Sequence, residues 1–148
     1  MSKKDFLPLE VTHHVRDHCL CMHLQRAARA VARMFDDALR PLGLTSGQFS
    51  ILMSVNRPDG PKIGAVAELL AMDRTTLTAN LKPLQRRELI NVDVDPDDRR
   101  GRRLSLTDAG RTLLAQAYPI WEATHEAAEE RLGGCNPDQL RSGLVSLS

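Results

Sequence analysis

The segment from Asp73 to Thr107 constrains the fold of this chain most, because a short helical pattern runs directly into a charged hairpin pattern. Asp73 suits a helix N-cap, since its carboxylate can accept hydrogen bonds from the free N–H groups of the first turn. Leucines then follow at helical spacing: Leu77, Leu81 and Leu84. The pattern predicts a helix that begins at residue 74 and buries this leucine face.

The other face of this helix carries hydrogen-bond donors and acceptors, at Thr75, Thr78, Lys82, and Gln85 or Arg86. Such side chains suit the edges of bases. Arg74 and Thr75 fall in the first turn, where free N–H groups attract an anion such as a phosphate. The alternative is an ordinary solvated face, and the helix alone does not separate the two interpretations.

After this helix, two runs alternate with the period of half-buried strands. In the first run, apolar Ile90, Val92 and Val94 alternate with Asn91, Asp93 and Asp95; in the second, Leu104 and Leu106 alternate with Arg103 and Ser105. The arm between the runs is too long for a tight turn, and Asp97 and Asp98 precede its arginines, which are Arg99, Arg100, Arg102 and Arg103. Positive charge on a protruding hairpin suits a phosphate backbone or a narrow minor groove, although a loop closed by Asp–Arg salt bridges is the alternative.

Positive charge is concentrated locally, because the whole 148-residue chain has a formal net charge of only +1. From Arg74 to Arg103 there are eight basic residues against five acidic ones. The N-terminal residues lack the apolar run of a signal peptide, and no segment approaches the ~18–20 apolar residues of a membrane span. We therefore expect a cytoplasmic protein with no membrane partner. Three cysteines, two of them in a C-x-C pair, do not form a disulfide framework.

The rest of the chain is predicted to be helical. A long first helix is expected over 11–40, ended by Pro41 and Gly43, and Thr45 with Gln48 resembles a capping box for the second helix. A third, short helix contains Ile63, and the three residues 71–73 connect it to the Arg74 helix, as in a helix-turn-helix.

The hairpin is followed by two more predicted helices. Thr107 can cap a long helix that Pro119 kinks and Gly133 ends, and Asn136 with Pro137 suits the start of the last helix. The fold class is thus mainly α with a small β-wing, with a winged helix-turn-helix lobe over 45–107. The segments 11–40 and 108–148 have more apolar surface than this lobe can cover, so we expect them to form a homodimer. Two-fold symmetry would place the two Arg74 helices ~34–36 Å apart, about one turn of DNA.

These features resemble the MarR (multiple antibiotic resistance regulator) family of winged-helix repressors. The resemblance rests on DRTTLTANLKPL and on Asp98-Arg99-Arg100 followed by Leu106-Thr107, which is similar to the family's D-x-R…L-T signature. It implies an obligate homodimer that binds a pseudo-palindromic double-stranded DNA operator and is released by a small organic effector or an oxidant. It also implies that Arg100 enters the minor groove with Asp98 orienting it, and that the major groove is faced by Arg74, Thr75, Thr76, Thr78 and Lys82. Arg86, Arg99 and Arg102 complete the predicted DNA contacts.

The signal to which the protein responds is less constrained. An effector could bind in a crevice between the dimer helices and the DNA-binding lobe, with candidate lining residues Met22, Arg26, Phe49, Met53, Trp121 and His125; the alternative is that these residues are simply core. Arg26 or Arg29 would suit an aromatic acid or another small anion.

Oxidant sensing is a second hypothesis. Cys21 aligns with the reactive cysteine of the family's organic hydroperoxide branch, but Gln25 stands where that branch has a tyrosine, and a buried structural cysteine is the alternative. Cys19 and Cys21 should not pair with each other within one helix.

A metal site is a third hypothesis, although we predict no metal or cofactor. His14, His18 and Cys21 would share one helical face, and His13, His23 and His125 could add nitrogens. Histidines near a helix start are more often solvated or capping groups.

No phosphate-binding loop, catalytic triad signature or H-E-x-x-H motif is present, so we do not expect an enzyme. A winged domain used only for protein contacts is the remaining alternative, against which the wing arginines argue.

Overall fold

The computed structural model describes residues 6–148. Within these residues the chain forms a helical frame with one small antiparallel sheet, in the order α1 (Leu9–His18), α2 (Leu20–Leu39), a 3-10 turn η1 (Arg40–Leu42), α3 (Ser46–Val55), α4 (Ile63–Leu69), α5 (Arg74–Arg86), β1 (Ile90–Val94), β2 (Arg102–Leu106), α6 (Asp108–Glu130) and α7 (Pro137–Leu147). The predicted fold class is confirmed.

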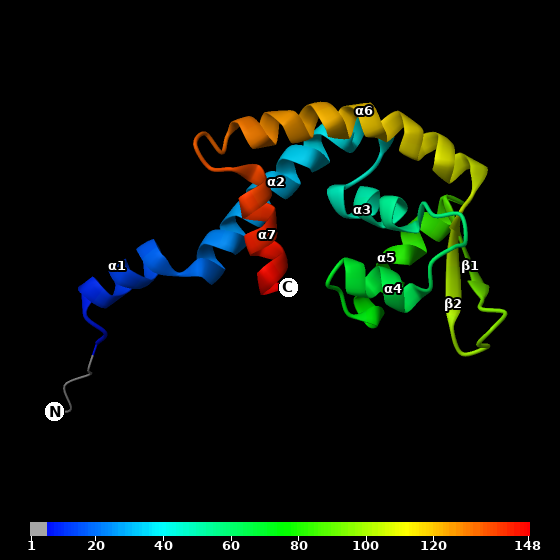
Figure 1. Cartoon of the computed structure of the whole chain (residues 1–148), viewed down its shortest axis with the longest axis horizontal. Coiled ribbons are helices and arrows are strands. Elements are labelled where there is room, and N and C mark those ends of the chain that lie inside the picture. The colour runs from blue at the N-terminus through cyan, green and yellow to red at the C-terminus, as the bar shows by residue number, and fades with distance from the viewer. Residues whose placement is uncertain (1–5) are drawn as a thin grey trace.

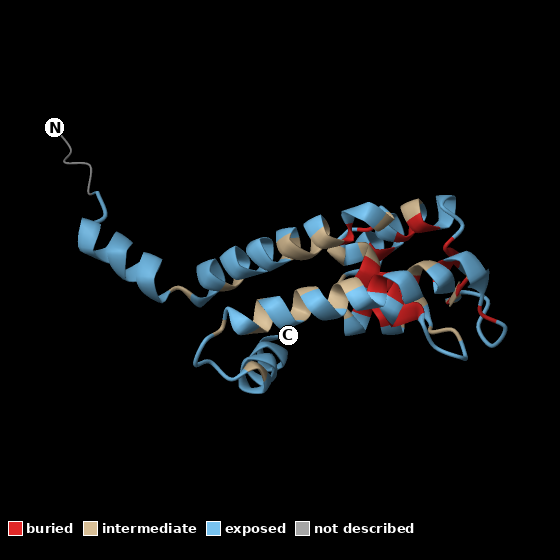
Figure 2. Cartoon of the chain, turned by 90° about the horizontal axis from the view of Figure 1, so that it is seen from above, coloured by how far each residue is buried: buried red, intermediate tan, exposed pale blue. Residues whose placement is uncertain are grey.

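The long helices α2 and α6 run side by side, and α3, α4, α5 and the β1–β2 wing lie beneath one end of this pair (Figure 1). The buried residues are concentrated in that lobe, whereas α1 and α7 lie at the other end with almost entirely exposed surfaces (Figure 2). The lobe's fully buried side chains include leucines from α2, α3, α5 and β2, which are Leu39, Leu52, Leu77, Leu81, Leu84 and Leu104. The lobe therefore has its own core, and the distal helices do not.

The helix starts follow the predicted caps. Thr45 and Gln48 form a capping box, in which the Thr45 hydroxyl accepts from Gln48 N–H (3.1 Å) and the Gln48 amide oxygen accepts from Thr45 N–H (3.1 Å). Asp73, Thr107 and Asn136 cap α5, α6 and α7 through bonds of 2.8 to 3.1 Å. Each cap satisfies a backbone N–H that has no partner within its own helix.

The predicted single helix over 11–40 is wrong, because it is two helices. The backbone is extended at Cys19 (φ −69°, ψ 110°), which ends α1 and makes Cys19 the N-cap of α2, where its Sγ accepts from Met22 N–H at 3.5 Å. The continuous helical face expected for His14, His18 and Cys21 therefore does not exist.

Two boundaries also differ from the sequence expectations. Four residues, Leu70–Asp73, connect α4 to α5, rather than three. The helix α6 continues through Pro119 but ends at Glu130, before Gly133, and a short turn leads to α7.

The wing has the predicted strands but not the predicted alternation at the end of β1. Ile90 pairs with Leu106 and Val94 pairs with Arg102 in an antiparallel register. Val94 is 52% exposed and Asp95 is fully buried, the reverse of the expected pattern. The reason is that β1 ends at Val94, and the Asp95 carboxylate turns inward to meet Lys62 and Arg103.

Candidate nucleic-acid interface

Helix α5 is anchored by its leucine face and presents its polar face to solvent. Leu77, Leu81 and Leu84 are buried against the lobe. The helix residues predicted to meet DNA are all exposed: Arg74, Thr75, Thr76, Thr78, Lys82 and Arg86. The four-residue connection from α4 gives the arrangement of a helix-turn-helix, with α5 as its second helix.

The first turn of α5 is fixed by Asp73. Its carboxylate accepts the backbone N–H of Thr76 at 2.8 Å and the Thr76 hydroxyl at 2.7 Å. These bonds hold the pKa of the Asp73 carboxyl below its ordinary value, with the backbone N–H of Thr76 as the largest cause. Thr76 therefore takes part in the N-cap of the helix and is also exposed on its surface.

This cap predicts an acid-dependent stability. A carboxyl whose folded-state pKa is lowered adds stability above its unfolded pKa, about 3.9, and this stability is lost as the pH falls through the folded-state pKa. Between about pH 5 and pH 2, the wild type should therefore lose more of its free energy of unfolding than the variant Asp73→Ala. Thermal unfolding followed by circular dichroism at several pH values measures the difference. An equal loss of the free energy of unfolding in the two proteins over this pH range would contradict the prediction.

The tip of the wing is shaped by Asp98. Its carboxylate accepts the backbone N–H of Arg100 at 3.0 Å, and its carbonyl accepts Gly101 N–H at 2.9 Å. The contact between Asp98 and Arg100 thus orients the backbone of the tip. Arg99, Arg100 and Arg102 are exposed, and the Arg102 guanidinium donates to the carbonyl of Gly101 at 3.0 Å.

The arginines of the wing fall into two groups. Arg103 pairs with Asp95 at 3.0 Å and with Asp97 at 3.4 Å. For this arginine, the alternative of a loop closed by Asp–Arg salt bridges is therefore correct. Within residues 6–148, Arg99, Arg100 and Arg102 are in no ion pair within 4.0 Å. Their charge is available to an external anion.

A hollow connects α5 with the wing. It lies beside the start of α4, and four basic side chains line it together with three acidic ones, which are Lys62, Arg74, Arg100, Arg102, Glu68, Asp95 and Asp98. The Arg74 guanidinium lies over Gly64, where an added Cβ would be only 2.6 Å from its Nη2. The first turn of α5 and the tip of the wing therefore border the same basic surface.

Comparison with known proteins agrees with this geometry. The model of the MarR family matches residues 44–101, which contain the helix-turn-helix and the first part of the wing. The transcriptional regulator HosA of Escherichia coli O111:H- is 31% identical over 91 residues, covering 62% of this chain and 67% of HosA. The M. tuberculosis regulator MosR, solved in complex with DNA, has a TM-score of 0.78 at 34% identity and covers 88% of this chain and 93% of MosR.

The chain belongs to the MarR family. It is a DNA-binding transcriptional regulator and not an enzyme. Two further solved structures are similar. The transcriptional repressor CouR bound to a 23-mer DNA duplex has a TM-score of 0.70 at 32% identity, covering 90% of this chain and 92% of CouR. BpsR of Bordetella bronchiseptica, whose DNA binding is regulated by 6-hydroxynicotinic acid, has a TM-score of 0.70 at 28% identity, covering 86% of this chain and 89% of BpsR.

The six residues expected to line one effector crevice lie in three places of this MarR-family chain. Phe49 is 6% exposed and stacks on Trp121 (centroids 6.2 Å apart), which stacks on His125 (4.7 Å). Met53 lines a separate hollow with Asn56, Arg111 and Tyr118, among other residues. Met22 and Arg26 line a third hollow.

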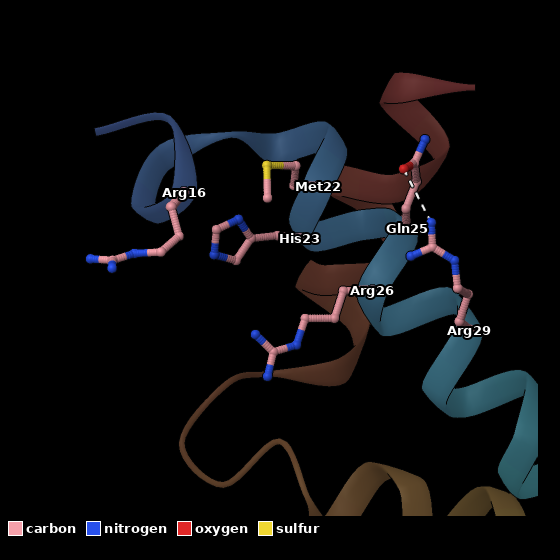
Figure 3. Close-up of a pocket in the computed structure, with 6 residues that line it drawn as sticks. All are labelled: Arg16, Met22, His23, Gln25, Arg26 and Arg29. Atoms are coloured by element: carbon pink, nitrogen blue, oxygen red, sulfur yellow. Dashed lines mark hydrogen bonds between the residues drawn. The ribbon is translucent and has the colours of Figure 1, made fainter. Parts of the chain in front are cut away.

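This third hollow is basic and lies where α1 meets α2. Its lining residues are Arg16, Met22, His23, Gln25, Arg26 and Arg29. Figure 3 shows His23 and Arg26 on one side of α2, facing the same space as Arg16 of α1, whereas Arg29 points elsewhere and donates to Gln25 at 3.4 Å. Arg16 itself pairs with Asp17 at 2.7 Å.

The cysteines and histidines do not form a cluster. Cys21 is exposed in the single chain. His14 and His18 stack on each other (4.4 Å), and the His23 ring donates to the carbonyl of Cys19 at 2.7 Å. In the part of the chain that the structure describes, no three metal-ligating side chains come together. Over the same residues, no helix is long and apolar enough to cross a bilayer.

Lys62, Glu68 and Asp95 are charged residues of this surface that the sequence patterns did not predict to belong to the site. Asp95 occupies a strand position expected to face solvent, and Lys62 lies in the loop before α4. Only their meeting in three dimensions, at 3.4 Å, gives them a role.

Proposed function

We propose that this MarR-family regulator is a homodimeric repressor that places one α5 helix in each of two successive major grooves of a pseudo-palindromic operator. The observation that carries the proposal is the common basic surface of the α5 first turn and the wing tip. On this surface Arg100 and Arg102 lack ion pairs among the described residues, and the polar face of α5 is exposed beside them. The proposed base contacts are those of Arg74, Thr75, Thr78 and Lys82, with Thr76 and Arg86 at the edges of the groove.

The wing would contact the adjacent minor groove. Arg100 stands at the tip, and a narrow minor groove attracts arginine through its enhanced negative potential. Asp98 would keep the tip backbone in place, and Arg99 and Arg102 would meet phosphates on either side.

Dimerisation is proposed from the surfaces of α1 and α7. Neither helix has a buried residue in the single chain, and large apolar side chains are exposed on both, among them Leu9, Val11, Val15, Leu140, Leu144 and Leu147. A partner copy would remove this surface from water. We therefore assign 11–40 and 108–148 to dimerisation and 45–107 to DNA binding. The proposed compartment is the cytoplasm, and the proposed partner is double-stranded operator DNA.

Hydroxyl-radical footprinting on a duplex selected from a random-sequence pool tests this arrangement. We expect protection related by two-fold symmetry, with the two half-sites ~10–10.5 base pairs apart from centre to centre. The minor groove flanking each half-site should also be protected, and Arg100→Ala should remove this flanking protection alone. A single unsymmetrical protected region would contradict the dimeric arrangement.

Release by a small organic effector completes the proposal. BpsR, a structural relative, has its DNA binding regulated by an aromatic acid. Here the hollow between α1 and α2 holds Arg16, His23 and Arg26, which suit a carboxylate. The first test is a set of aromatic acids added to the protein–DNA complex. If the hollow is the site, release should be lost in Arg26→Gln, and release that is unchanged in this variant would place the effector elsewhere.

A second candidate is release by an organic hydroperoxide that oxidises Cys21, whose thiol is exposed in the single chain. Loss of DNA binding on oxidation, restored by thiol and absent in Cys21→Ser, would support this candidate. Binding that persists after oxidation would exclude it.

A further inference from the structure

The Asp95 carboxylate is a buried charge inside the wing. Its side chain has no exposed surface, and its Oδ1 accepts from Arg103 Nε at 3.0 Å and from the backbone N–H of Asp97 at 3.1 Å. Its Oδ2 accepts no hydrogen bond within residues 6–148 and lies 3.4 Å from Lys62 Nζ. These groups hold the pKa of Asp95 below its ordinary value, with the Asp97 N–H as the largest cause and Arg103 as the next.

The same group of residues joins the wing to the loop between α3 and α4. The Arg103 guanidinium donates to the carbonyls of Asp59 and Gly60, both at 3.2 Å, and Leu104 N–H donates to the Pro61 carbonyl at 2.9 Å. Gly60 has φ +57°, and an added Cβ there would lie 2.7 Å from the Leu104 carbonyl. Lys62 and Arg103 also form an isolated antiparallel bridge. The root of the wing is therefore attached at several points to the segment that leads into α4.

Asp95 also closes the loop that carries the tip of the wing. Its backbone N–H donates to the Gly101 carbonyl at 3.1 Å, and the Asp95 Cβ would lie 3.5 Å from a Cβ on Gly101. Arg99 and Arg100 lie within the loop between these two residues. The direction in which the tip projects from the lobe therefore depends on how Asp95 is held.

We propose that Lys62, Asp95 and Arg103 form a wing anchor, which positions Arg100 for DNA without contacting DNA itself. The proposal rests on the proposed DNA-binding function and adds positioning residues to it. A rigidly placed arginine binds more tightly than a mobile one, because the free energy of ordering the loop does not have to be supplied on binding.

The sign of the effect separates this role from simple electrostatics. A carboxylate close to DNA repels phosphates, so removing one should strengthen DNA binding if charge alone matters. If the anchor positions the wing, Asp95→Asn should instead weaken binding, by about tenfold, which corresponds to about 1.4 kcal/mol. Asp93→Asn is the matched control, since Asp93 is an exposed wing carboxylate on β1 and its replacement changes the net charge equally. It should leave affinity unchanged or raise it.

Arg103→Lys provides a test without any change in net charge. A lysine keeps the positive charge but lacks the planar fork that reaches Asp95 and the two loop carbonyls together. The proposal predicts weaker binding for this variant as well. The loss of DNA affinity caused by Asp95→Asn should largely disappear when the substitution is made in an Arg100→Ala background, because the anchor acts through that arginine.

Hydrogen exchange of the free protein, together with operator affinity, tests the proposal. In Asp95→Asn and Arg103→Lys, the Asp95 and Leu104 amides should exchange faster by about tenfold, while α3 and α5 amides keep their protection. This readout needs no DNA, so failure of the proposed DNA contacts is distinguishable from failure of the anchor. Unchanged exchange in the wing, stronger DNA binding by Asp95→Asn, or an undiminished effect of Asp95→Asn in the Arg100→Ala background would each overturn the proposal.

Discussion

Leu140→Asp combined with Leu144→Asp is expected to give a monomer that binds the operator 10²- to 10⁴-fold more weakly, roughly the gain that linking two binding modules supplies. The two leucines lie four residues apart on one face of α7, and each is partly exposed in the single chain. Two carboxylates in the proposed apolar interface would have to lose their hydration without a partner charge. Each monomer would then hold only one half-site.

The same helix offers a control with equal charge and spacing. Ser142 and Ser146 also lie four residues apart but on the opposite side of α7. Ser142→Asp with Ser146→Asp should leave both the dimer and operator affinity unchanged. Sedimentation velocity and titration of the same duplex measure both variants. A stable dimer of the leucine variant with undiminished affinity would place the interface elsewhere.

Arg100→Ala is expected to cost ~1–3 kcal/mol of binding free energy, about five- to 150-fold in affinity. Arg100 is exposed at the wing tip, where the Asp98 carboxylate fixes its backbone. Its loss should also relax discrimination at flanking A·T positions, because these determine the width of the minor groove. The measurement is a competition between duplexes that differ only in the flanks.

Arg100→Lys distinguishes shape recognition from charge alone. Lysine keeps the charge that attracts phosphates but has a compact, strongly hydrated ammonium in place of the flat guanidinium. We expect partial recovery of affinity with little recovery of discrimination at the flanks. Full recovery of both would mean that Arg100 contributes only charge.

Local features of the fold could be predicted from the sequence because their causes are contiguous in the chain. The caps at Thr45, Asp73, Thr107 and Asn136 each require a side chain and a backbone N–H within three residues. The leucine stripe of α5 and the strands of the wing likewise follow from periods of 3.6 and 2. The positions of the exposed α5 residues follow from the same pattern.

Features that depend on distant residues could not be predicted in this way. Asp95 can be buried because its carboxylate forms ion pairs with Arg103 and Lys62. Lys62 lies much earlier in the sequence, before α5. The break at Cys19 has no proline or glycine to mark it. The expected effector crevice involves a second chain and stays a prediction, whereas within the single chain Phe49 and Trp121 stack on each other against the core.

The most direct test of the central claim is fluorescence anisotropy on a duplex that the protein selects from a random pool, compared with a duplex in which one half-site is scrambled. We expect tight binding to the intact duplex that resists competitor DNA, and an affinity that falls by orders of magnitude when one half-site is scrambled. The logarithm of the binding constant should fall linearly with the logarithm of salt concentration, with a slope of about −0.9 for each phosphate neutralised. Failure of the selection to enrich any sequence, or equal affinity for the intact and scrambled duplexes, would contradict sequence-specific recognition by paired α5 helices and wings.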